Sequence, residues 1–145
     1  RPLAGGLEFL RDRFTSRDAA RAVRTGAGAV YHACVHNALH ERDPELLAGL
    51  YKVAVFTLQA KYFRDTGWYV ARHRALLDRL EGEDRAVLER ALALRAGETP
   101  DLEADGGLLF RWARARRRPR GLVCGDTRKT AGAFGVQTID FGRRI

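Results

Sequence analysis

The stretch of sequence that decides the fold is PELLAGLYKVAVFTLQAKYFR, residues 44–64. Asp43 precedes Pro44, and this pair is an N-cap and first-turn signal for a helix. The apolar side chains of the stretch surround nearly the whole helical circumference, which is typical of a helix enclosed by its neighbours. The turn Asp65-Thr66-Gly67 ends it. We therefore predict a central helix over residues 44–64 with other helices packed around it.

Four further helices are predicted around this central one. The clearest is residues 17–40, because apolar side chains recur there at spacings of three, four and one: Val23, Ala27, Val30, Tyr31, Cys34 and Ala38. Similar patterns predict helices over 72–80, over 83–95, and from 108 into the arginines that follow, with an extended connector at 68–71. The sequence thus predicts an all-α fold, an antiparallel bundle of about five helices.

Two glycines interrupt the first predicted helix. Gly26 and Gly28 would each weaken it by about 1 kcal/mol relative to Ala. A glycine is favourable in a helix where another backbone packs closely against it. Close packing at one or both positions is therefore an expectation for the structure.

The composition changes after Pro119, where glycines become too frequent for a helix. Two short apolar runs, 122–124 and 134–139, could pair as a hairpin. We divide the chain into a helical bundle domain, residues 1–117, and a Gly-rich, basic tail, residues 118–145.

The positive charge is concentrated at the C-terminal end. Residues 111–145 carry 10 Arg and Lys against 2 acidic residues, which accounts for the whole net charge of +8. A localised positive field attracts phosphate-bearing partners or an acidic protein surface. A solvated tail without a partner is the alternative.

Several function classes lack their sequence signals. No apolar run approaches the roughly 20 residues that cross a bilayer, and no secretory leader is recognised. Two cysteines do not build a disulfide framework, so we expect a cytoplasmic protein without a membrane span. A Gly-rich phosphate loop, an Asp-x-Asp pair and a Cys-x-x-Cys motif are all lacking. No catalytic residue is therefore named, and whether the chain is an enzyme stays open.

Cations near the end of the last predicted helix are candidate phosphate-binding residues. Guanidinium groups bind phosphate in a bidentate manner, and an indole can stack on a base. For Trp112 we favour a place in the core over such stacking. The predicted phosphate-binding residues of this run are Arg111, Arg114, Arg117 and Arg118.

A second candidate site is the connector after the central helix. Arg64, Trp68 and Tyr69 gather a cation and aromatic rings at a break between helices. Such a break can line a substrate pocket, and it can equally be the aromatic seam of a bundle.

Three histidines follow one line on the first predicted helix, opposite its apolar stripe. Residues at i and i+4 can share a metal ion, so His32 and His36 are candidate zinc ligands, with a third ligand required from elsewhere. Small side chains continue the line and suit a homodimer interface. Surface histidines without a role are the third alternative. The line comprises Ala22, Thr25, Ala29, His32, His36 and His40.

Part of the chain resembles a known family. Residues 55–70, 74–77 and 82–88, together with a Leu-Leu-Phe-x-Trp helix at 108–112, are similar to the C-terminal helical domain of small bacterial nucleotidyltransferases. These proteins are distant relatives of the aminoglycoside-modifying enzymes, and the domain is similar in turn to the HEPN helical bundles. The likeness covers about residues 45–115.

The resemblance implies an all-helical, substrate-side domain. Its catalytic partner, a sheet domain with a Gly-Ser motif and paired aspartates, would be a separate domain or subunit that supplies Mg²⁺ with a nucleotide. HEPN ribonucleases carry an Arg followed at four to six residues by a His, whereas Arg24 to His32 and Arg64 to His73 are separated by seven and eight residues. This spacing departs from the ribonuclease pattern.

Two functional hypotheses follow. In the first, the chain is a helical substrate- or partner-binding domain of nucleotidyltransferase type, which lacks the catalytic sheet domain. In the second, it is a stand-alone, basic, HEPN-like module that binds RNA or another nucleic acid, with nuclease activity as a further option.

Overall fold

The computed structural model describes residues 14–117. They form α1 (Ser16–His36), a short π-helical segment η2 (Asn37–Glu41), α2 (Pro44–Thr66), α3 (His73–Leu77), α4 (Gly82–Arg95) and α5 (Ala104–Arg117). This part of the chain is helical and contains no strand, which confirms the predicted all-α fold. The predicted hairpin, the tail 118–145 and Arg118 lie outside the described residues.

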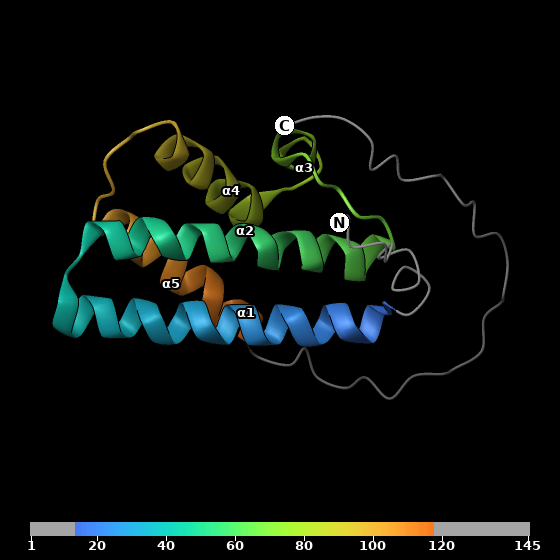
Figure 1. The fold of residues 1–145 in the computed structure, drawn as a ribbon, viewed down its shortest axis with the longest axis horizontal. Helices are drawn as coiled ribbons and strands as arrows, with labels where there is room; N and C mark the ends of the chain where they lie inside the picture. The colour runs from blue at the N-terminus through green and yellow to red at the C-terminus, as the bar shows by residue number, and fades with distance from the viewer. Residues whose placement is uncertain (1–13, 118–145) are drawn as a thin grey trace, which may run out of the picture.

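The two long helices, α1 and α2, lie side by side and run in opposite directions, while α5 packs behind them (Figure 1). α4 packs on α2 from the side away from α1 and slopes away from it toward its own C-terminal end. The predicted central helix is therefore in place, because α2 contacts α1, α4 and α5.

The close approach of α1 and α2 explains one of the two glycines. A Cβ atom added at Gly26 would collide with the hydroxyl of Thr57 and lie 3.2 Å from its Cβ. At Gly28, an added Cβ meets no atom within 4 Å. Close packing is thus found at the first glycine and not at the second.

Local hydrogen bonds set the beginning of α1 and the turn into α2. Thr15 and Asp18 form a capping box, in which each side chain accepts from the other residue's backbone N–H. At the other end, the Asn37 side chain donates to the Asp43 carbonyl oxygen at 3.0 Å and accepts from the Asp43 N–H at 2.8 Å. Asn37 is buried, so these bonds fix the turn between the helices.

The core is formed by the inner faces of all five α-helices. Its largest fully buried side chains are Trp112 of α5, Tyr51 and Leu58 of α2, and Leu76 and Leu88 of the shorter helices. The core position that we favoured for Trp112 is therefore confirmed.

Three predicted helix boundaries differ from the structure by more than two residues. The first α-helical stretch ends at His36 rather than at residue 40, because Asn37 diverts the chain into the π-helical segment. α3 ends at Leu77 rather than at residue 80, where tighter i to i+3 turns bring Leu80 into the core. α5 begins at Ala104 rather than at 108, because the Asp101 carboxylate accepts from the backbone N–H of Ala104 at 2.8 Å.

The lengths and hydropathies of the helices bear on membrane insertion. Across residues 14–117, none of the helices is both long enough and apolar enough to traverse a bilayer.

Candidate functional site

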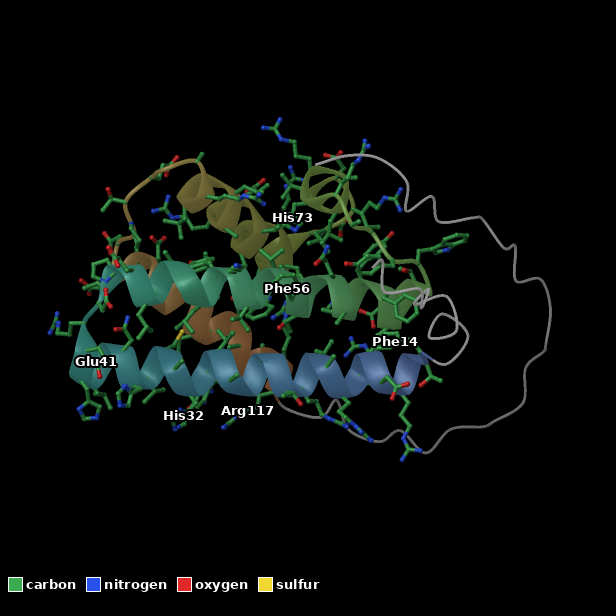
Figure 2. All side chains as sticks on the ribbon, viewed as in Figure 1. Phe14, His32, Glu41, Phe56, His73 and Arg117 are labelled. Carbon is green, nitrogen blue, oxygen red and sulfur yellow. The ribbon has the colours of Figure 1, made fainter. Side chains whose placement is uncertain are left out.

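The exposed side of α5 carries the predicted phosphate-binding arginines. Arg111 and Arg114 face solvent, on the side opposite the buried Leu109 and Trp112. The Arg117 guanidinium lies over the ring of Tyr31, 4.2 Å from its centroid, and Figure 2 places it next to α1. Among the arginines of α5, the ion pairs within the described part of the chain involve a different residue, Arg116.

That arginine, Arg116, belongs to a buried network around Asp84. The Asp84 carboxylate accepts from the Trp112 indole N–H and from the Arg116 Nε, each at 2.8 Å, and lies 3.0 Å from the Lys61 Nζ. Asp84 is 7% exposed, so the pairs are partly shielded from water. Because Trp112 is fully buried and hydrogen-bonded, it anchors α5 to α4 and is not available to stack on a base.

The same network continues to the connector after α2. Lys61 also contacts Asp65 at 3.1 Å, and Asp65 lies 2.7 Å from Arg64. Burial alone would raise the pKa of Asp65, but hydrogen bonds from Arg64 and Lys61 hold it below its ordinary value. A chain of ion pairs therefore links the last turns of α2, directly before the connector, to the end of α5.

The two aromatic residues of the connector are accessible to a ligand. Trp68 is 48% exposed and Tyr69 is 46% exposed. Gln59 donates from its side-chain amide to the carbonyl oxygens of Val70 and Ala71, at 3.0 and 3.3 Å, which holds the connector against α2. The connector is thus a fixed, aromatic surface at the end of α2.

The histidine line is confirmed as an exposed surface. His32, His36 and His40 all face solvent, together with Ala22, Thr25 and Ala29. The ring centroids of His36 and His40 are 4.9 Å apart, and His36 Nδ1 lies 3.8 Å from a Glu41 carboxylate oxygen. Within residues 14–117, no three His, Cys, Asp or Glu side chains are arranged to hold a metal ion. Zinc binding by His32 and His36 therefore lacks a third protein ligand in this part of the chain.

A second buried network, which the sequence did not reveal, fixes the loop between α4 and α5. Arg90 pairs with both carboxylate oxygens of Asp105 at 2.7 and 2.9 Å and also contacts Glu98. The hydrogen bonds that Arg90 donates to the Asp105 carboxylate are the main reason that the pKa of Arg90 is raised. Tyr51 donates its hydroxyl to the Asp105 backbone oxygen at 3.0 Å. These groups are occupied with one another, so their role is structural.

A groove of about 440 Å³ lies between α2, α3 and α4. None of the predicted site residues that the structure describes lines it. The pattern of α2 could not reveal it, because a helix that is apolar on all sides does not show which side its neighbours leave open.

The chain was compared with protein families, with characterised proteins and with solved structures, and no match was found. The resemblance to nucleotidyltransferase helical domains accordingly stays a prediction.

Proposed function

We propose that this helical bundle binds single-stranded nucleic acid through the end of α5 and the neighbouring connector. The observation that supports this most is the exposure of Arg111, Arg114 and Arg117 on one helix whose other arginine is held by Asp84. Guanidinium groups left open to solvent are suited to bidentate contacts with phosphate.

The placement of the candidate residues favours a polymer over a mononucleotide. A small ligand needs groups that converge on one cavity. The arginines of α5 and the aromatic residues of the connector instead occupy two surface regions, joined by the ion pairs from Arg64 to Arg116. A flexible strand can touch both regions at once, with phosphates on the arginines and bases on exposed rings.

The exposed aromatic residues supply the second element of such a surface. Stacking of one base on an aromatic ring contributes about 1–3 kcal/mol and is tolerant of sequence. Trp68 and Tyr69 are each about half exposed, so a base can cover them without unfolding of the bundle. The sequence adds Arg118 and Arg120 directly after α5, so the positive charge continues in the chain.

The hypothesis of a nucleotidyltransferase-type domain stays a prediction. It would require a catalytic domain or subunit that brings a nucleotide with Mg²⁺, and the described residues add no observation that favours this over polymer binding. Nuclease activity likewise stays a prediction.

Fluorescence anisotropy tests the proposal with a labelled single-stranded RNA of about 20 nucleotides at about 50 mM salt, where phosphate contacts are strong. We expect saturable binding that the double variant Arg111→Ala/Arg114→Ala weakens by at least about tenfold. The matched control is Arg21→Ala/Arg24→Ala, which removes two exposed arginines from α1. Wild-type affinity is expected for this control.

Two further measurements complete the test. UMP at millimolar concentration should fail to displace the RNA, because a monomer contacts one region alone. A denaturing gel of each sample separates binding from cleavage. Lack of binding at low salt, or an equal loss in the control and in the α5 variant, would contradict the proposal.

A further inference from the structure

The groove between α2, α3 and α4 combines an apolar floor with a positively charged edge. Its floor contains Val55 and Leu92, and Phe56 lies at its rim with 59% of its surface exposed. In Figure 2, Phe56 on α2 and His73 at the start of α3 lie on the same side of the molecule. The lining residues are Ala48, Tyr51, Lys52, Val55, Phe56, His73, Ala91, Leu92, Leu94 and Arg95.

All the ionisable groups at the rim are basic. Lys52 of α2 and Arg95 of α4 are exposed, and His73 is partly buried. No acidic side chain of residues 14–117 lines the groove. Glu89 of α4 pairs with Arg85, and Glu98, which follows α4, pairs with Arg90, so both carboxylates are engaged elsewhere.

This arrangement favours a ligand that has both an apolar body and a negative charge. Water contacts the apolar floor until a ligand covers it, so burial of an apolar body there is favourable. The positive rim favours an anionic group on that body. Among the described residues, the lining contains no Asn, Gln, Ser or Thr, and the Tyr51 hydroxyl already donates to Asp105. The remaining polar side chains of the lining are Lys52, His73 and Arg95, which suit an anionic group, and no neutral amide or free hydroxyl is left to read the polar edges of a nucleobase.

We propose that this groove binds an amphipathic organic anion, in which an apolar ring or branched chain carries a phosphate or carboxylate. The apolar body lies on Val55, Phe56 and Leu92, and the anionic group lies toward Lys52 and Arg95. A volume of about 440 Å³ is within the usual range for small-molecule sites. The groove shares no residue with the proposed nucleic-acid surface, so either proposal can fail without the other.

The test uses 1-naphthyl phosphate as the probe, with 1-naphthol as its neutral counterpart and inorganic phosphate as its anionic part. Calorimetry should show saturable binding of 1-naphthyl phosphate, at least about tenfold weaker binding of 1-naphthol, and no saturable binding of inorganic phosphate. Binding of AMP should be weaker than that of 1-naphthyl phosphate, because the described lining offers its base no amide side chain and no free hydroxyl.

Variants test the charged rim and the apolar surface of the groove separately. The variant Lys52→Ala/Arg95→Ala should weaken 1-naphthyl phosphate by about threefold to tenfold and leave 1-naphthol unchanged. Phe56→Ala should weaken both aromatic probes. Leu39→Ala is the matched control, because Leu39 is an apolar residue with 70% exposure that does not line the groove, and its substitution should have no effect. All these side chains are exposed, so circular dichroism should show an unchanged fold.

Backbone amide chemical shifts locate the ligand independently of the variants. On addition of 1-naphthyl phosphate, the largest changes should fall in residues 48–56, in His73 and in residues 91–95. Equal affinity for 1-naphthol, lack of binding by either aromatic probe, or an equal loss in Leu39→Ala would each overturn the proposal.

Discussion

The close contact between Gly26 of α1 and Thr57 of α2 leads to a prediction in which Gly28, on the same helix, is the reference position. Gly26→Ala and Gly28→Ala each replace a glycine inside the same helix, so each gains about 0.5–1 kcal/mol of helix propensity. At Gly28 the new methyl group meets open space, and the free energy of unfolding should increase by that amount. At Gly26 the methyl group collides with Thr57, whose hydroxyl is held by a hydrogen bond to the Val53 carbonyl oxygen at 3.0 Å.

The magnitude follows from the comparison of the two variants. Overpacking of a close interface costs about 1–3 kcal/mol, while the propensity gain is common to both positions and cancels. Gly26→Ala should therefore be less stable than Gly28→Ala by about 1–3 kcal/mol. For a domain of this size, the Tm difference is at least about 4 °C.

Thermal and urea unfolding followed by circular dichroism measure both free energies. A double-mutant cycle with Thr57→Ala, which removes the hydroxyl and the methyl group, should recover part of the loss at Gly26. The reasoning is refuted if Gly26→Ala is as stabilising as Gly28→Ala, or if Thr57→Ala changes both variants equally.

Three further predictions concern single groups. Asn37→Ala leaves the partly buried Asp43 N–H without its partner and removes one of the two donors to the Asp43 carbonyl oxygen, so it should lower the free energy of unfolding by about 1–3 kcal/mol, measured by urea denaturation; an unchanged midpoint would be contrary to the described turn. The pKa of Asp65 is lowered in the folded state, so the Asp65 carboxylate stabilises the fold fully above its unfolded pKa of about 4. This stabilisation is lost as the pH falls from there through the lower pKa of the folded state. Unfolding experiments between neutral pH and about pH 2 should accordingly show a smaller acid destabilisation for Asp65→Asn than for wild type, and identical profiles would disprove the role of its ion pairs. Burial raises the pKa of Cys34 to about 11, so a Cys124→Ser variant should react with a disulfide reagent at pH 8 at least about tenfold more slowly when folded than in urea, and equal rates would show that the thiol is accessible.

The fold was predictable because most apolar residues that recur at helical spacing are buried in the structure. Of the predicted stripe, Val23, Ala27, Val30 and Cys34 are buried and Tyr31 is partly buried. Ala38 is exposed, because it lies in the π-helical segment, where the periodicity of α1 no longer holds. α2 occupies the predicted central position. Local signals of spacing and capping were sufficient for these elements.

The structural networks were not predictable from local signals. In the sequence, Asp84 is one of two acidic residues in the first turn of α4. In the structure, it contacts Lys61, Trp112 and Arg116 of two other helices. Partners separated by 20 or more residues leave no spacing pattern, so such a pairing follows from packing alone. The Asn37 turn escaped prediction for a related reason, because a polar residue within a helical pattern does not show which backbone groups it will bind.

The candidate site was predictable in part. Exposure of Arg111 and Arg114 agrees with the predicted phosphate-binding surface, whereas Arg116 is committed to Asp84. The groove was not predicted, since all the apolar residues in the segment that contains Phe56 suggest burial. Phe56 is instead exposed, because α4 slopes away from α2.

The salt dependence of RNA binding tests the central claim most directly, because it counts phosphate contacts. For a single strand, the slope of log K against log salt is about −0.7 per contacted phosphate. Contacts from Arg111, Arg114 and Arg117 predict a contribution of about −2 to the wild-type slope, and Arg111→Gln/Arg114→Gln should make the slope shallower by about 1.4. An unchanged slope in this variant would show that the phosphates lie elsewhere and would contradict the account.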